Sequence, residues 1–350
     1  MRTKPTALTL KAITALILGA IHIAASAATP LSSKPSTGIP FADGDHVLFL
    51  GDSITQDGRY IAFIETYLWA AYPNHSFEIF NMGVSAETVS NTTEPGHRRR
   101  PWVHDRVEPA LEISDPDWVF ICYGMNDGNY YPSRPDIQTA YLKQLGRLLE
   151  RIEPTGAQIV LLTPPPFDSV SKPSKNLLPP GQDVYGYSKT YELYDDTLIA
   201  LGALAQGRYG NHVERFIDIH TPLTDYIHNA RRVEPDYRYG DGVHPPTDGH
   251  LQFALAILQG LGEDPARCSK LITKATGVTL VGEPSAGGGD PKQQETWKQI
   301  LSRFNALSKF YRNQTRPETR ESFSTASELK KIEPRDTTKL RQRVENLVKP

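Results

Sequence analysis

The 350-residue chain is long enough to bury a substantial core, and its 39% hydrophobic and 22% charged residues are typical of a globular protein. A formal net charge of -2 provides no global attraction to nucleic acid or to an anionic membrane, so we expect neither as a partner. With Cys122 and Cys268 as its only cysteines, the chain is not a disulfide scaffold, and Cys122 is predicted to be a buried thiol.

Residues 1–28 have the layout of a cleavable signal peptide. Arg2 and Lys4 precede an apolar segment over 12–25, and small residues follow it. An anchoring helix is the alternative, but this segment is shorter than the roughly 20 residues that span a bilayer. We therefore expect a secreted or periplasmic protein without stable membrane insertion, and a leader over residues 29–45.

Apolar runs alternate with helical patterns through the main predicted domain, residues 46–282. Strands are expected at 46–50, 76–80, 118–123, 158–162 and 215–219, and helices at 60–72, 137–152, 193–204 and 251–261. Apolar runs without polar alternation suit strands that are covered on both faces, as in a parallel sheet. The pattern predicts an α/β fold, a three-layer α/β/α sandwich with a parallel five-stranded sheet.

Residues 283–350 are predicted to form a linker and a helical C-terminal extension. The segment 284–289 is rich in glycine and reads as a flexible linker. Two apolar stripes follow it, namely Trp297, Ile300, Leu301, Phe304 and Tyr311, and then Leu340, Val344 and Leu347. Such stripes favour packing onto the parent domain over binding a partner.

A serine lies in a small-residue turn between the first predicted strand and the first helix. The segment Gly51-Asp52-Ser53-Ile54-Thr55 can expose the hydroxyl of Ser53 above the carboxyl edge of the sheet. Serine is a weak nucleophile by itself, so this turn predicts catalysis only if a base, an orienting group and oxyanion donors are found elsewhere.

A histidine and an aspartate near the last helix of the domain can supply the base. Asp241 precedes His244 by three residues in a turn, close enough to accept a hydrogen bond from the imidazole. Taken alone, this spacing is also typical of an aspartate that caps a local turn.

Two residues that follow predicted strands can supply oxyanion donors. Gly83 lacks a side chain and so lets its backbone N–H approach a substrate, and Asn126 carries an amide. With the N–H of Ser53 they would form a three-donor oxyanion hole.

The segments around these residues resemble the four sequence blocks of the SGNH hydrolases, the GDSL esterase and lipase superfamily. Ser53 lies in the nucleophile block, Gly83 in the second, Asn126 in the third and His244 in the base block, while Ala86 stands where many members carry glycine. The resemblance implies a flavodoxin-like sheet and an ester hydrolase with a Ser-His-Asp triad and no metal or other cofactor. Independently, the chain has no G-x-S-x-G motif, which argues against an α/β-hydrolase.

Several residues near these blocks are candidates for substrate binding. We expect Asp52, Asp127 and Tyr130 to contact the substrate. Export and aromatic residues in the site loops favour O-acetyl or other acyl groups on a carbohydrate or polysaccharide; the aromatics are Trp102, Tyr130, Tyr131, Phe167, Tyr185 and Tyr187. Packing of these loops is an equally good interpretation of the same aromatics.

Other interpretations stay open at this level. A lipase or thioesterase acting on acyl chains is the second enzymatic candidate, and a carbohydrate-binding protein that retains the fold without turnover is the third. The run Arg98-Arg99-Arg100 suits uronate or sulfate groups of a substrate, but a solvated loop or a contact with local carboxylates is the favoured interpretation. Tyr311-Arg312-Asn313 and Arg316 are candidates to reach the site from the extension.

Overall fold

The computed structural model describes residues 38–284, 290–315 and 337–349. The predicted signal peptide, the leader up to residue 37, the linker segment 285–289 and Arg316 lie outside these residues. The described residues all fall in one compact unit.

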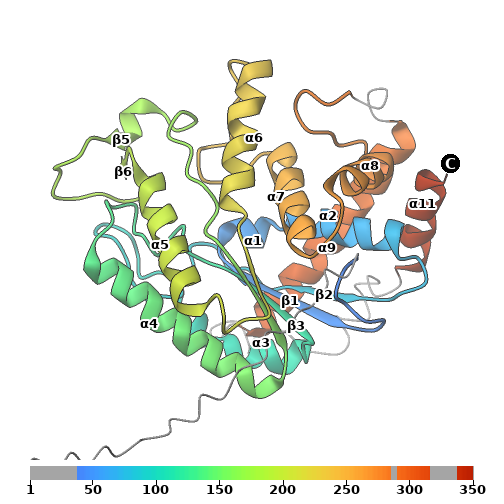
Figure 1. Ribbon diagram of the computed structural model, residues 1–350, viewed down its shortest axis with the longest axis horizontal. Coiled ribbons are helices and arrows are strands. Elements are labelled where there is room, and N and C mark those ends of the chain that lie inside the picture. Colours follow the sequence, from blue (N-terminus) through green and yellow to red (C-terminus); the bar gives the residue numbers. More distant parts are fainter. Residues whose placement is uncertain (1–37, 285–289, 316–336, 350) are drawn as a thin grey trace, which may run out of the picture. The chain divides into compact units, whose positions relative to one another are not determined.

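A parallel five-stranded sheet lies at the centre of this unit, with the strand order β2-β1-β3-β4-β7 (Figure 1). Its strands are β1 (His46–Gly51), β2 (Glu78–Asn81), β3 (Trp118–Cys122), β4 (Gln158–Leu162) and β7 (Arg215–Ile217). The expected three-layer α/β/α architecture is thereby confirmed. Two further strands, β5 (Leu177–Leu178) and β6 (Thr190–Tyr191), pair within the long loop after β4.

The strands are mainly apolar because both faces of the sheet are covered. Along β1, Val47 and Phe49 face one hydrophobic core, whereas Leu48 and Leu50 face the other. The same alternation continues in β3, where Phe120 belongs to the first core. Continuous burial therefore explains why the polar alternation of a one-sided sheet is missing from the sequence.

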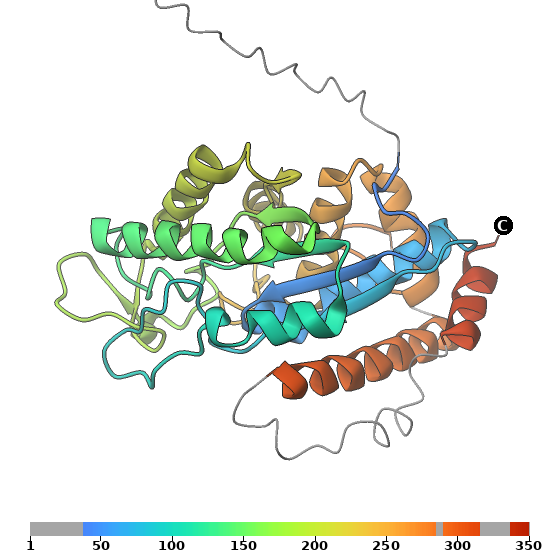
Figure 2. The same cartoon turned by 90° about the horizontal axis from the view of Figure 1, so that it is seen from below.

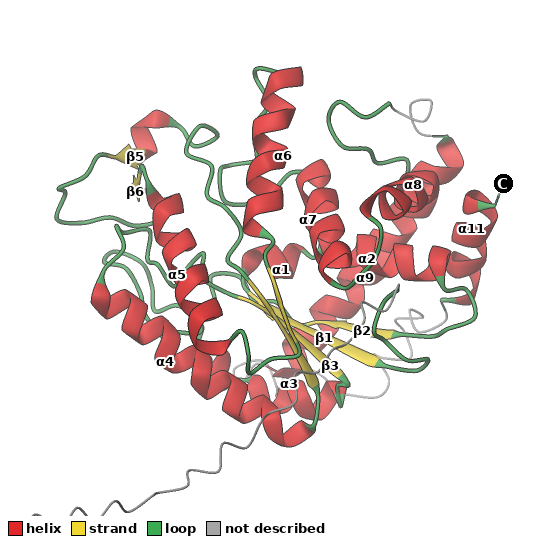
Figure 3. Ribbon diagram, in the orientation of Figure 1, coloured by secondary structure: helices red, strands yellow, loops and turns green. Residues whose placement is uncertain are grey.

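Helices form the two outer layers, as the colouring by secondary structure shows (Figure 3). Their bounds are α1 (Ser53–Asp57), α2 (Arg59–Ala71), α3 (Val107–Ser114), α4 (Pro135–Ile152), α5 (Tyr194–Tyr209), α6 (His220–Val233), α7 (Thr247–Gly260), α8 (Pro265–Thr276), α9 (Pro291–Thr315) and α11 (Thr338–Val348). Helices α2, α6, α7 and α8 bury their apolar residues in the first core, and α3 and α4 bury theirs in the second.

Four of these helices were not predicted, and the shortest of them is α1, which forms within the predicted turn. The sequence after Gly262 lacks a long apolar pattern, yet α8 forms there because Asp264 caps its N-terminus and Pro265 occupies its first turn. Helices α3 and α6 were also missed, since each presents only four or five buried residues to its core. Short or mainly polar helices of this kind depend on tertiary packing more than on their own periodicity.

Helix α9 covers the edge strand of the sheet. Trp297 and Phe304 belong to the first core, whereas Leu307 and Tyr311 belong to the second, so the helix passes across β2 from one face to the other. Figure 2 shows α9 as a long helix that runs beside α3. Covering an edge strand protects its unpaired backbone groups from other chains. The predicted packing of this stripe onto the domain is confirmed.

Candidate active site

Ser53 lies at the first position of α1, directly beyond the carboxyl end of β1. Asp52 caps this helix, because its carboxylate accepts the backbone N–H of Ile54 at 3.0 Å. A β-carbon at Gly51 would lie 2.1 Å from Oγ1 of Thr55 and 2.8 Å from the carbonyl oxygen of Cys122, so only glycine fits there. The turn therefore carries the strand into the helix with the serine half-buried at the edge of the sheet.

The serine contacts the histidine predicted as its base. Oγ of Ser53 lies 2.8 Å from Nε2 of His244, and Nδ1 of the same ring lies 3.1 Å from Oδ2 of Asp241. The other carboxylate oxygen of Asp241 accepts the backbone N–H groups of Val243 and His244, at 3.0 and 2.8 Å. This turn leaves Oδ2 directed at the ring, and the three side chains form one hydrogen-bonded series.

The charges of the series stabilise each other. Burial lowers the pKa of His244, but the hydrogen bond and the negative charge of Asp241 outweigh it, so the net pKa is raised from 6.5. Burial raises the pKa of Asp241, and the hydrogen bonds from His244 more than offset this, leaving that pKa well below its usual range. Asp241 is therefore ionised at neutral pH and favours the protonated form of the imidazole.

Asn126 follows β3 and is held by two donors. Its Oδ1 accepts from Nη1 of Arg100 at 2.9 Å and from the hydroxyl of Tyr130 at 3.0 Å. Its Nδ2 therefore turns to the opposite side, where it lies 3.3 Å from Oδ2 of Asp52 and 3.2 Å from the carbonyl oxygen of Glu87. The orientation of the amide is set by its neighbours.

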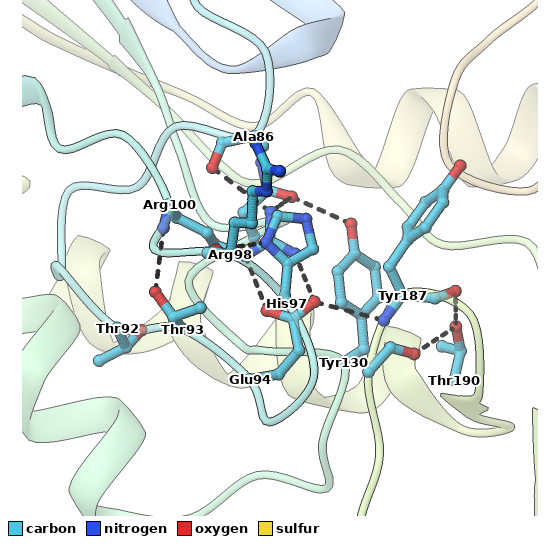
Figure 4. A network of polar contacts seen from close by, with 12 residues as sticks. Ala86, Thr92, Thr93, Glu94, His97, Arg98, Arg100, Tyr130, Tyr187 and Thr190 are labelled. Atoms are coloured by element: carbon cyan, nitrogen blue, oxygen red, sulfur yellow. Dashed lines mark hydrogen bonds and ion pairs between the residues drawn. The ribbon is translucent and has the colours of Figure 1, made fainter.

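Arg100 is in turn fixed by a buried ion pair with Glu94 (Figure 4). Both side chains are 3% exposed, and the guanidinium donates to both carboxylate oxygens, at 2.7 and 2.5 Å. Glu94 also accepts the backbone N–H of Tyr187 at 3.4 Å. Of the run Arg98-Arg99-Arg100, the last arginine thus contacts a local carboxylate, and the first two are exposed.

Gly83 lies close to the turn of Ser53. A β-carbon on Gly83 would be 2.4 Å from the backbone nitrogen of Gln56, so the glycine lets the second block pack directly on α1. Its N–H donates to Oδ1 of Asn81 at 3.0 Å. To serve as an oxyanion donor, this N–H would have to donate to the substrate oxygen in addition to Asn81, or in place of it.

The three residues expected to bind substrate are buried. Asp52, Asp127 and Tyr130 are 3%, 0% and 1% exposed, and each makes its hydrogen bonds within the protein. Asp127 accepts the backbone N–H groups of Val89, Ser90 and Gly124, which ties the second block to the third. In the structure these side chains hold neighbouring segments of the site together, and their direct contact with a substrate stays a prediction.

Burial also affects the protonation of the two aspartates. It raises the pKa of Asp52 to about 7 and that of Asp127 to about 6, with hydrogen bonds from backbone amides opposing the shift in each case. Asp52 is therefore partly protonated near neutral pH, which reduces negative charge beside Asn126.

Most of the aromatic residues expected in the site loops pack inside the protein. Tyr130, Tyr131, Phe167 and Tyr185 are each less than 8% exposed, whereas Tyr187 is 37% exposed. The hydroxyl of Tyr187 donates to Oδ2 of Asp241 at 2.8 Å. Sequence reasoning missed this contact and the role of Arg100, and no motif connects either residue to its partner.

Two further observations concern the described residues only. No cluster of three or more potential metal-ligating side chains occurs within residues 38–284, 290–315 and 337–349. In the same ranges, none of the helices combines the length and the apolar character required for a membrane span. Cys122 and Cys268 are both free and buried.

Tyr311, which was considered as a contributor to the site, is 3% exposed and packs on Phe80 of β2, with ring centroids 4.9 Å apart. Its ring is thus part of the packing between α9 and the sheet.

Comparison with known proteins identifies the family. A family model for GDSL-like lipases and acylhydrolases matches residues 49–251, which include every segment of the candidate site. An acetylxylan esterase of Geobacillus stearothermophilus is 25% identical over 234 residues, which cover 63% of this chain and 94% of that enzyme.

One solved structure shares the fold of this chain, and a second one matches it more distantly. A gut microbial diltiazem-metabolizing enzyme matches with a TM-score of 0.51 and 22% identity, over 65% of this chain and 49% of its own, so this chain spans about half of that enzyme. The crystal structure of the Geobacillus stearothermophilus acetylxylan esterase matches with a TM-score of 0.46 and 23% identity, over 64% of this chain and 97% of that one. Because the family model covers more than half of the chain, the protein belongs to the GDSL-like lipase/acylhydrolase family of the SGNH hydrolases and is an ester hydrolase.

Proposed function

We propose that this protein is a serine esterase that removes O-acetyl groups, or other short acyl groups, from a carbohydrate. The observation that carries the catalytic part is the hydrogen-bonded series Ser53, His244 and Asp241, with Oγ to Nε2 at 2.8 Å and Nδ1 to Oδ2 at 3.1 Å. The similarity to an acetylxylan esterase supports the acetyl and carbohydrate part.

In the proposed reaction, His244 takes the proton of Ser53 while Oγ attacks the acyl carbonyl. Asp241 stabilises the imidazolium that forms. The N–H groups of Ser53 and Gly83 and the amide of Asn126 then stabilise the negative charge on the carbonyl oxygen. His244 passes its proton to the sugar oxygen, which leaves as an alcohol, and an acyl-enzyme ester on Ser53 remains.

Water completes the cycle in the same site. His244 takes a proton from the water, the resulting hydroxide attacks the acyl-enzyme, and the proton returns to Oγ of Ser53 as acetate leaves. No further group is needed for the proton balance, because each proton that His244 accepts is returned within the same half-reaction.

Hydrolysis of 4-nitrophenyl acetate by the wild type and by Ser53→Ala tests the catalytic part. We expect the substitution to reduce kcat by about three orders of magnitude or more without loss of folding. Equal rates for the two proteins would leave a non-catalytic binding protein as the better interpretation of the fold.

Acetate release from acetylated polysaccharides, compared with hydrolysis of esters of longer acyl chains, tests the substrate. We expect the highest kcat/KM on acetyl groups. A preference for chains of about eight carbons or more would overturn the carbohydrate assignment in favour of a lipase or thioesterase, since each added methylene contributes about 1–3 kcal/mol of discrimination in an apolar pocket.

A further inference from the structure

Lys172 is a nearly fully buried lysine beside the candidate site. It lies in the long loop between β4 and β5 and is 6% exposed. The loop packs against the turn of Asp241 and His244: the N–H of Asp168 donates to the carbonyl oxygen of Gly242 at 2.9 Å, and a β-carbon on Gly242 would lie 3.4 Å from the backbone nitrogen of Lys172. The lysine is therefore held at a fixed place relative to the catalytic histidine.

The ammonium group lies among aromatic rings. Its Nζ is 4.2 Å from the ring centroid of Tyr187, 5.9 Å from that of Phe167 and 6.0 Å from that of Tyr130. Cation–π contacts compensate an ammonium only in part for the water that it loses on burial. The rings alone therefore do not replace the hydrogen bonds that an ammonium makes in water.

The structure shows no protein anion bonded to this ammonium. Within the described ranges, Lys172 makes neither a hydrogen bond through Nζ nor an ion pair, whereas the two arginines buried to a similar depth, Arg100 and Arg106, pair with Glu94 and Glu87. The nearby carboxylate of Asp241 already accepts from His244, Val243 and Tyr187. Burial lowers the pKa of Lys172 and the charge of Asp241 opposes this shift, as expected for an ammonium without a bonded counter-ion.

Two of the rings around Lys172 belong to tyrosines that are hydrogen-bonded to residues of the candidate site. The hydroxyl of Tyr187 donates to Asp241, and the hydroxyl of Tyr130 donates to Asn126. The two rings lie 5.5 Å apart, so the ammonium is close to two rings whose hydroxyls bond residues of the candidate site. Tyr187 is also 37% exposed, which leaves part of its ring available to a sugar next to the ammonium.

We propose that Lys172 binds an anionic substituent of the substrate, a carboxylate or a sulfate, so that the preferred ester is an acyl group on an acidic carbohydrate. The proposal rests on the proposed carbohydrate esterase activity for its substrate, and on the ammonium of Lys172, which bonds no protein anion within the described residues, for its site. An anion at Nζ supplies the missing partner of the ammonium, and an interaction with a charged group is worth about 1.5–3 kcal/mol, or roughly ten- to a hundredfold in affinity.

The first experiment uses the wild-type protein and the inhibition of 4-nitrophenyl acetate hydrolysis by free sugars. Methyl glucuronoside carries a carboxylate, glucose 6-sulfate carries a sulfate, and methyl glucoside is the neutral control. We expect at least one of the two acidic sugars to inhibit at a concentration about tenfold or more below that of methyl glucoside. Equal inhibition by all three would overturn the proposal, and the two acidic probes identify which anion is preferred.

The second experiment assigns the preference to the lysine. In Lys172→Met the side chain stays unbranched and becomes one atom shorter, and it loses its charge, so the preference for the acidic sugar over methyl glucoside should fall by about tenfold. Lys175→Met, at an exposed lysine of the same loop, is the matched control and should retain the preference. A preference that survives in Lys172→Met would refute the assignment; Lys172→Arg, which keeps the charge, distinguishes loss of the anion site from a folding defect because it should restore the preference.

The two proposals fail in different ways. If the wild type hydrolyses 4-nitrophenyl acetate but releases no acetate from any carbohydrate, the proposed function fails, while inhibition by an acidic sugar still reports on Lys172. If acetate is released equally well from neutral, uronate-bearing and sulfated polysaccharides, the esterase assignment stands and the anion site is excluded.

Discussion

Arg100 donates a hydrogen bond from Nη1 to Oδ1 of Asn126 across 2.9 Å, and both side chains are 3% exposed. An amide whose oxygen is held in this way presents its N–H groups in one direction only. Because Arg100 is itself held by two hydrogen bonds to Glu94, the direction of the Asn126 amide depends on a buried ion pair that no substrate atom needs to touch.

Arg100→Lys tests this dependence. Lysine retains the charge opposite Glu94 but loses the planar fork that bonds the glutamate and Asn126 together. We expect kcat for 4-nitrophenyl acetate to fall by about ten- to a hundredfold with KM nearly unchanged, less than the two to three orders of magnitude lost with an oxyanion donor itself. Steady-state kinetics measure both constants.

Arg303→Lys is the matched control for Arg100→Lys. Arg303 pairs with Glu65 at 2.9 Å, and this pair joins α9 to α2. We expect it to lower the melting temperature while leaving kcat unchanged. If the two variants lost stability alike and neither lost kcat, the positioning role of Arg100 would be wrong.

The pH dependence of kcat/KM should report His244. Its pKa is raised above 6.5, and only the neutral ring can accept the proton of Ser53, so kcat/KM should fall as pH drops through a midpoint above 6.5. Asp241→Asn removes the partner that raises this pKa. The midpoint should then move to lower pH, while the rate at pH 8 falls by about two to four orders of magnitude. An unchanged midpoint would show that Asp241 does not govern the ionisation of His244.

Tyr187→Phe should move the same midpoint in the opposite direction. Without the hydroxyl at 2.8 Å, the carboxylate of Asp241 loses a donor and attracts the proton of His244 more strongly, which raises the pKa of the histidine further. The ring is partly exposed, so water can replace the donor and the loss of kcat should stay below about tenfold. A midpoint at lower pH than in the wild type would contradict this account.

Gly83→Ala should destabilise the protein through a backbone clash. The added carbon would lie 2.4 Å from the nitrogen of Gln56 and would push on the helix that carries Ser53. We expect a loss of about 1–3 kcal/mol in the free energy of unfolding, measured by urea denaturation, together with reduced kcat. Gly207→Ala in α5 is the control, because it meets no atom within 4 Å and should stabilise the helix by about 0.5–1 kcal/mol.

Trp297→Ala tests the structural role of the C-terminal extension. The indole is 8% exposed and stacks on Phe63 of α2, with ring centroids 4.4 Å apart. Its removal should cost about 3–5 kcal/mol of folding free energy without changing KM, which thermal denaturation and kinetics measure together. A changed KM at unchanged stability would indicate that α9 contributes to the substrate site instead of packing on the sheet.

Much of the fold could be predicted because the strands of a buried sheet consist mainly of apolar residues, and such runs are visible in the sequence. The run Gln158–Leu162 coincides with β4, and the run from Trp118 contains β3, since a strand covered on both faces is apolar along most of its length. Helix α8 and the other helices that were missed have few buried residues, so their packing partners decide whether they form.

The sequence by itself determined the fold class and the segments around Ser53, Asn126 and His244. The carboxyl ends of parallel strands meet at one edge of a sheet, and the types of the residues that follow these strands restrict the chemistry that can occur there. Only the tertiary structure decided that Arg100 orients Asn126 and that Tyr187 contacts Asp241. The partners in these pairs are 26 and 54 residues apart, and no local periodicity relates such positions. It also decided that Lys172 is buried without a bonded anion, since burial of a loop residue depends on the neighbours that the fold brings to it.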